Sequence, residues 1–148
     1  MSKALLVEAV RKTVTVDCTV EEAFRVFTTE AGSWWPVDTH SINVEVEDIV
    51  FEPGVGGTVY EIGANGERAH WATVLEWDPP HRLVLSWNIL ERPGDATEVE
   101  VRFVPDGSGA RVELEHRGWE DVEDDRAAKR ANYDTGWDVV LREYVGRA

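Results

Sequence analysis

The stretch from residue 98 to residue 116 alternates apolar and polar side chains almost without interruption, and this pattern constrains the fold more than any other feature of the chain. A period of two residues is typical of β-strands that bury one face and expose the other. A turn sequence at residues 106–109 divides the stretch into two strands, 98–104 and 111–116. Their inward-facing residues are Val99, Val101, Phe103, Val112, Leu114 and His116. Such an antiparallel pair needs another element to cover its apolar face.

Several other segments have the features of strands, and they extend this pair into a larger sheet. Residues 8–16 alternate and are rich in β-branched side chains, which favour strands. Asn65-Gly66 separates two later strands and is typical of a tight hairpin. The predicted strands are 8–16, one from Ile49, 58–62, 69–77, 82–88, 98–104 and 111–116. We therefore expect a meander of about six to seven antiparallel strands.

Helical regions are predicted near both ends of the chain. The first begins after Thr19, followed by Glu22 as in a capping box, and it ends near Gly32, before Pro36. The second spans about residues 124–145, where apolar side chains recur at spacings of three and four and form one stripe. That stripe contains Tyr133, Trp137, Val140, Leu141 and Tyr144. The predicted fold is α+β, a curved antiparallel sheet wrapped around a long C-terminal helix.

Composition excludes several classes of function. The chain has 148 residues, which fits a single domain over 1–148. It carries 15 Lys and Arg against 29 Asp and Glu, and a net charge of −14 argues against binding to nucleic acid or to an anionic membrane. The single cysteine, Cys18, excludes an internal disulfide. We find neither a signal-peptide core nor an apolar run near the roughly 20 residues that span a bilayer, so we expect a cytoplasmic protein.

The sequence holds no motif for metal binding or covalent catalysis. The four histidines, His40, His70, His81 and His116, lack the spacing of a zinc site, and no Gly-x-Ser-x-Gly surrounds a nucleophile. We therefore assign no catalytic residue, no metal and no cofactor. His40 lies in a segment without a clear pattern and His81 follows a Pro-Pro turn, so we expect both to be exposed.

Five local patterns occur in an order that resembles one protein superfamily. They are Val20-Glu21-Glu22-Ala23-Phe24, Trp34-Trp35-Pro36, Gly56-Gly57, the stretch from Asp78-Pro79-Pro80 to Trp87, and Gly136-Trp137 with Leu141. With the order of predicted elements, they resemble the START-like or SRPBCC superfamily, and within it the homologues of the activator of the heat-shock-protein-90 ATPase. The resemblance implies a helix-grip fold, in which two short helices follow the first strand and the sheet wraps around the C-terminal helix.

The same resemblance implies an apolar cavity between sheet and helix, and seven tryptophans suit its walls. The residues expected to face it are Trp34, Trp35, Tyr60, Trp71, Trp87, His116, Tyr133 and Trp137. For each of them the alternative is that the side chain only fills the core. Trp71 depends on the strand phase, because a shift by one residue turns His70 inward instead. His116 either contacts a ligand, acts in proton transfer, or meets solvent at the end of its strand.

Three functional hypotheses follow from the resemblance. The first is a module that binds a small hydrophobic, aromatic or polycyclic molecule. Residues 129–137 resemble proteins that resist enediyne antibiotics by self-sacrifice, so this module would act in resistance by sequestration or self-sacrifice; the sequence singles out no sacrificed glycine, although Gly94 lies in a predicted loop. The second is a cyclase or hydratase that uses the same cavity. The third is a co-chaperone-like interaction module. The lack of a convergent acid–base pair favours binding over catalysis, and no protein partner is identified.

Overall fold

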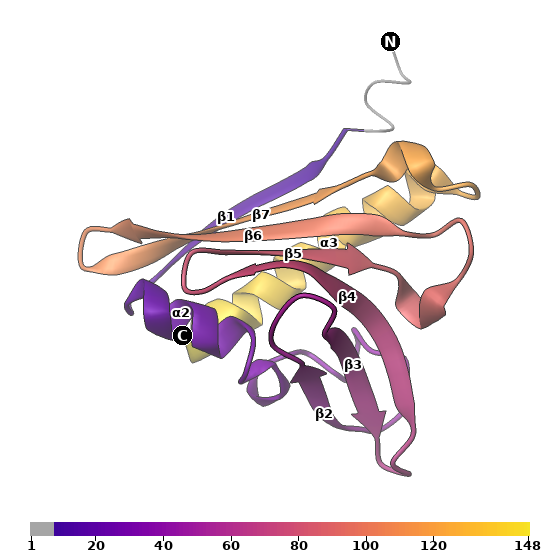
Figure 1. Cartoon of the computed structure of the whole chain (residues 1–148), viewed down its shortest axis with the longest axis horizontal. Helices are drawn as coiled ribbons and strands as arrows, with labels where there is room; N and C mark the ends of the chain where they lie inside the picture. The colour runs from indigo at the N-terminus through magenta and orange to yellow at the C-terminus, as the bar shows by residue number, and fades with distance from the viewer. Residues whose placement is uncertain (1–7) are drawn as a thin grey trace.

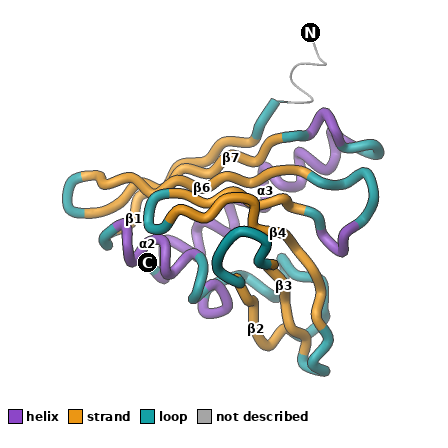
Figure 2. The backbone as a smooth tube through the Cα atoms, in the orientation of Figure 1, coloured by secondary structure: helices purple, strands orange, loops and turns teal. Residues whose placement is uncertain are grey.

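One seven-stranded antiparallel sheet dominates the computed structural model, which describes residues 8–148. The strand order is β1-β7-β6-β5-β4-β3-β2, so the first strand pairs with the last at one edge. The strands are β1 (Val10–Val16), β2 (Val46–Phe51), β3 (Thr58–Gly63), β4 (Arg68–Asp78), β5 (Arg82–Trp87), β6 (Thr97–Asp106) and β7 (Gly109–Arg117). Helix α3 (Arg126–Arg147) crosses one face of this sheet (Figures 1 and 2). The predicted α+β helix-grip architecture is confirmed.

Irregular pairing curves the sheet. The register shifts between Val46 and Asp48 on β2, after Val59 on β3, and between Val74 and Glu76 on β4. An unpaired extra residue bends its strand and increases the local twist. These shifts all lie in the β2–β5 half of the sheet, where Figure 1 shows β4 bending strongly along its length. The alternating pattern predicted the strands but gave no sign of the bulges.

Helix α2 (Val20–Phe27) joins the sheet to α3. Its N-terminus is capped as predicted, because the Glu22 amide donates to Thr19 Oγ1 at 3.2 Å. Phe27 packs edge-on against Tyr144 of α3, and the Tyr144 hydroxyl donates to the Ala23 carbonyl at 2.8 Å. The second predicted short helix is a single 3₁₀ turn, η1 (Ala31–Ser33). The contacts of Tyr144 therefore hold the C-terminal end of α3 against α2.

The inward face of α3 carries the predicted stripe. Trp137, Val140, Leu141 and Tyr144 are buried, and Tyr133 is half-buried. The helix begins at Arg126, two residues later than predicted, because Asp125 adopts a left-handed backbone conformation with φ 53°. No helix among the described residues is long and apolar enough to cross a membrane.

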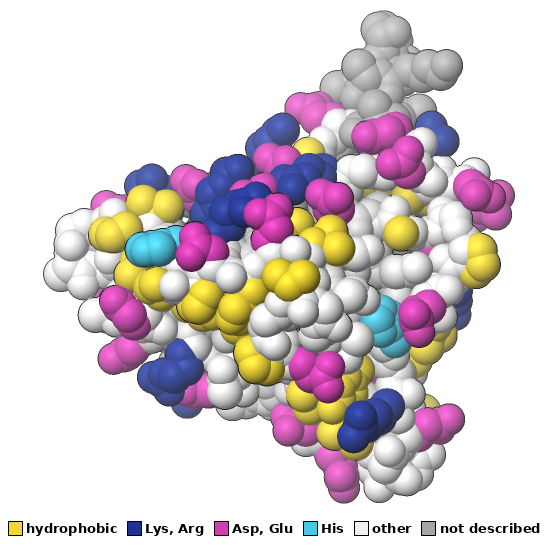
Figure 3. All heavy atoms as spheres, in the orientation of Figure 1, with side chains coloured by type: hydrophobic (Ala, Val, Ile, Leu, Met, Phe, Trp, Pro, Cys, Tyr) yellow, Lys and Arg dark blue, Asp and Glu magenta, His cyan; other side chains and the backbone are white. Residues whose placement is uncertain are grey.

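Charged side chains gather on the opposite face of the sheet, as Figure 3 shows. At their centre, buried Glu100 contacts Arg82 Nε at 2.6 Å, Arg102 Nε at 2.9 Å and Arg117 Nη1 at 2.5 Å. Burial by itself would raise the pKa of Glu100, but the hydrogen bonds from Arg117 and Arg82 hold this pKa at about 2. The acidic and basic residues of this face therefore neutralise one another, while the apolar face turns toward α3.

Candidate functional site

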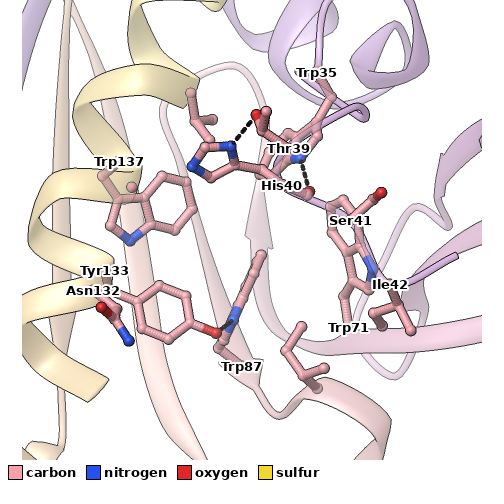
Figure 4. Close-up of a pocket in the computed structure, with 13 residues that line it drawn as sticks. Trp35, Thr39, His40, Ser41, Ile42, Trp71, Trp87, Asn132, Tyr133 and Trp137 are labelled. Atoms are coloured by element: carbon pink, nitrogen blue, oxygen red, sulfur yellow. Dashed lines mark hydrogen bonds between the residues drawn. The ribbon is translucent and has the colours of Figure 1, made fainter. Parts of the chain in front are cut away.

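A pocket of about 250 Å³ lies between α3, the ends of β4 and β5, and residues 39–42, which we call the pocket loop. Its lining residues are Trp35, Thr39, His40, Ser41, Ile42, Trp71, Trp87, Ile89, Asn132, Tyr133, Gly136, Trp137 and Val140. In Figure 4 the side chains of α3 face those of the pocket loop and of the sheet across the space. Exposed Thr39, Ile42 and Asn132 form its rim, so the pocket reaches the surface.

Four indoles build the apolar wall. The ring centroids of Trp35 and Trp71 are 4.8 Å apart, those of Trp71 and Trp87 are 5.9 Å apart, and those of Trp87 and Trp137 are 5.6 Å apart. Trp35 also contacts Trp137 at 6.1 Å, which closes the set into a ring of contacts. These rings are tilted or edge-on to one another, the arrangements that aromatic pairs favour. The wall is therefore rigid before any molecule enters, and core packing and pocket lining are the same contacts.

One buried carboxylate fastens the pocket loop to this wall. Glu61 on β3 is fully buried, and its Oε1 accepts hydrogen bonds from the Trp71 indole at 2.8 Å and from the Ile42 amide at 2.7 Å. Its Oε2 accepts from the amide of Asn43 at 2.7 Å and from the Asn43 side chain at 2.9 Å. A buried carboxylate needs such donors, and here they come from the wall and from the loop. Glu61 therefore sets the position of one side of the pocket.

Tyr133 supplies a polar group on the opposite side. Its hydroxyl oxygen accepts a hydrogen bond from the Trp87 indole at 2.9 Å, which leaves the hydroxyl proton free to be donated. Burial raises the pKa of the Tyr133 phenol, and the hydrogen bond from Trp87 only partly opposes this effect. The phenol is therefore a neutral donor at physiological pH.

His116 lies behind the wall and does not line the pocket. It is fully buried, which rules out the alternative that it meets solvent. Its Nδ1 accepts from the Trp137 indole at 3.0 Å, so its Nε2 carries the proton toward Thr97 Oγ1 at 2.7 Å. Burial lowers the pKa of His116 to about 3 and keeps the ring neutral. His116 therefore supports Trp137 from behind through this hydrogen bond.

Two other predicted residues also lie outside the pocket. Trp34 packs against Tyr144 and donates its indole N–H to the Val26 carbonyl at 2.7 Å, so it belongs to the core near α2. Tyr60 points to the outer face of β3, under the guanidinium of Arg68 at 4.8 Å from its ring centroid. The inward positions of this strand are Val59, Glu61 and Gly63. The expectation that Tyr60 faces inward is therefore wrong by one residue of strand phase.

Comparison with known proteins assigns the family. A family model described as "Activator of Hsp90 ATPase homolog 1-like protein" matches residues 17–144. The chain belongs to this family. No curated protein matches the chain.

Three solved structures that are similar to this chain are informative. The anthrahydroquino-γ-pyrone synthase Txn09 is 35% identical, with 93% of this chain and 95% of that chain covered and a TM-score of 0.64. The self-sacrificing resistance protein CalC from Micromonospora echinospora is 27% identical, with 96% of this chain and 94% of that chain covered and a TM-score of 0.66. The Aha1 dimer from Colwellia psychrerythraea is 20% identical, with 93% of each chain covered and a TM-score of 0.66, which shows the fold alone.

Within this Activator of Hsp90 ATPase homolog 1-like domain, five of the eight predicted site residues line the pocket. They are Trp35, Trp71, Trp87, Tyr133 and Trp137. Trp71 is buried and His70 is only half-buried, as the predicted phase of β4 requires. Sequence reasoning missed the pocket loop, above all His40, because no periodic pattern identifies a loop. The binding role of all these residues stays a prediction.

Proposed function

We propose that the chain binds a planar, polycyclic aromatic molecule in the four-indole pocket. The ring of contacts among Trp35, Trp71, Trp87 and Trp137 carries this proposal, because a preformed aromatic wall favours stacking with a flat aromatic guest. The Tyr133 hydroxyl can donate to a ligand oxygen and fix its orientation. The likeness to Txn09, whose name refers to an anthrahydroquinone and a pyrone, supports the same ligand class.

A second candidate function is catalysis in the same pocket. The most identical of the neighbours described above is named a synthase of an anthrahydroquino-γ-pyrone. Such a reaction needs the same planar guest, together with a group that can move a proton. The cyclase hypothesis therefore extends the binding proposal. The co-chaperone-like module stays a prediction, because the likeness to the Aha1 dimer concerns the fold.

A leucine at position 136 is expected to close the pocket. Gly136 lines it on α3, and the position of an added Cβ lies 3.7 Å from the His40 ring, so a larger side chain extends into the space. We expect alizarin, a dihydroxyanthraquinone, to quench the tryptophan fluorescence of the unmodified chain. The Gly136→Leu variant should bind it at least about tenfold more weakly, since the guest and the leucine compete for one volume.

The matched control is Gly146→Leu, which places the same side chain on the same helix. Gly146 is exposed and has open space around it, so alizarin binding should not change. Thermal melts of both variants show whether each remains folded. Equal affinity of the Gly136→Leu variant and the unmodified chain, or no quenching of the unmodified chain, would remove the proposal.

Resistance by self-sacrifice is a narrower form of the binding proposal, supported by the likeness to CalC. It requires a glycine within reach of the bound molecule. Gly136 lines the pocket, whereas Gly94 does not, and the position of a Cβ on Gly94 is covered by the Glu123 carboxyl group at 2.7 Å. Mass spectrometry after exposure to an activated enediyne tests this form. Cleavage at Gly136 supports self-sacrifice, and an intact chain contradicts it while leaving aromatic binding to the alizarin experiment.

A further inference from the structure

The pocket contains two side chains that can exchange a proton, a phenol and an imidazole. Within the described residues, the lining includes no Asp, Glu, Lys, Arg or Cys. Its titratable members are His40 and Tyr133. Tyr133 is a neutral donor, because burial raises the pKa of its phenol. An imidazole is the side chain that most often serves as a base in enzyme sites, which leaves His40.

His40 is held in a defined position. The Trp35 indole donates to the His40 carbonyl at 2.8 Å, and the His40 amide donates to the Pro36 carbonyl at 2.9 Å. The ring itself is held by Thr39, whose Oγ1 lies 2.6 Å from His40 Nδ1, as drawn in Figure 4. When Nδ1 donates its proton to this hydroxyl, the lone pair of Nε2 is free. The loop thus fixes both the backbone and the ring before any molecule binds.

The free nitrogen lies on the edge of the His40 ring that faces Gly136 of α3, and both residues line the pocket. The Cδ2–Nε2 edge of His40 lies 3.7 Å from the position that a Cβ would take on Gly136. Figure 4 shows the imidazole between Thr39 and Trp137, on the side of the pocket away from Tyr133. A guest between these two walls meets a hydroxyl donor on one side and an imidazole on the other. His116 cannot take this role, because both its nitrogens are already engaged behind the wall.

We propose that His40 is the proton-accepting residue of the pocket and that its ligand is a phenol-bearing polycyclic aromatic. This inference rests on the proposed function and names the chemistry of its site. In the step, the phenol O–H bond breaks, its electron pair stays on oxygen, and the proton forms an N–H bond at His40 Nε2. The products are a phenolate and an imidazolium, so charge and atoms balance without a further reactant. Thr39 is a positioning residue that acts through Nδ1.

Alizarin tests the step directly, because its visible spectrum changes when a phenol ionises. Tryptophan quenching measures binding, and absorbance measures ionisation of the bound dye as pH is varied. We expect the dye bound to the unmodified chain to ionise at a pH lower by about one unit than the dye bound to His40→Gln, a tenfold difference in the ionisation constant. The His40→Gln variant should still bind, since the four indoles remain.

Further variants test whether Thr39 positions the His40 ring or only contributes to the structure of the pocket loop. Thr39→Val removes the partner of Nδ1 and should lose part of the shift, while Thr39→Ser keeps a hydroxyl and should restore it. His70→Gln, on the outer face of β4, should leave the titration unchanged. The proposal is overturned if the dye titrates identically in His40→Gln and the unmodified chain, or if His40→Gln abolishes quenching. Failure of the unmodified chain to quench at all rejects the binding proposal itself, which is a different result.

Discussion

Replacing Glu61 by alanine is expected to lower the free energy of unfolding by about 3 kcal/mol. The variant removes the carboxylate that accepts a hydrogen bond from the buried Trp71 indole. It also removes the acceptor of two backbone amides, that of Ile42 in the pocket loop and that of Asn43 beside it. Each buried donor without a partner costs about 1–3 kcal/mol, but the loop amides can turn toward water, so the sum stays near the cost of one or two donors. Urea denaturation measures this loss.

The same variant is expected to weaken alizarin binding by at least about tenfold, because the loop that carries Thr39 and His40 loses its anchor on the sheet. Amide hydrogen exchange gives a second measurement: Ile42 and Asn43 should exchange faster in Glu61→Ala. Unchanged protection of these two amides would show that the loop is held by other contacts. A role for Glu61 in the pocket would then be rejected even if stability falls.

Two controls distinguish the loss of the Glu61 hydrogen bonds from the general effect of removing a glutamate. Glu47 is exposed on the neighbouring strand β2, and Glu47→Ala should change the free energy of unfolding by less than about 0.5 kcal/mol. Glu61→Gln keeps the size of the side chain and one oxygen, but its NH₂ group faces donors. Its stability should therefore lie between those of the unmodified chain and Glu61→Ala.

The fold could be predicted because the alternation of apolar and polar residues within each strand shows which of its side chains are buried. β6 and β7 are predicted within a few residues of their ends, and their pairing places Val101 opposite Leu114 as a regular hairpin requires. The stripe on α3 is likewise a local pattern. Tyr60 shows where this signal fails: β3 is short and has apolar residues in both phases, so its pattern favours the phase of Tyr60 and Ile62 over that of Val59. The inward residue is Glu61, which no hydrophobic pattern selects.

The pocket could be predicted only in part, for a related reason. Trp71, Trp87 and Trp137 lie on periodic elements, and their inward position follows from the pattern, whereas Trp35 lies in the bend after η1. The pocket loop takes its conformation from partners distant in sequence: Ile42 and Asn43 bind Glu61, and His40 lies against Gly136. A single sequence contains no local trace of such contacts. The acidic residue Glu61, placed within a short strand, is the one feature of the sequence that points to this anchor.

Stability is expected to fall steeply in mild acid because of His116. Its pKa is about 6.5 in an unfolded chain and about 3 in the folded protein, where burial disfavours the charged ring. Between these two values the unfolded chain binds a proton that the folded protein does not. The stabilising contribution is therefore fully present above about pH 6.5 and is lost as pH falls toward 3, by about 1.4 kcal/mol for each pH unit.

His116→Gln isolates this contribution, since an amide hydrogen-bonds but does not titrate in this range. The variant is expected to be less stable at pH 7, because one side chain cannot reproduce both contacts to Thr97 and Trp137. From pH 6.5 to 5, above the range where most carboxylates protonate, its free energy of unfolding should change much less with pH than that of the unmodified chain. His81→Gln, at an exposed histidine, should keep the full pH dependence. Urea denaturation at half-unit steps of pH measures the slopes. If the free energy of unfolding changes equally with pH in His116→Gln and in the unmodified chain, His116 titrates normally in the folded protein. The conclusion that its ring is neutral and hydrogen-bonded behind Trp137 would then be wrong.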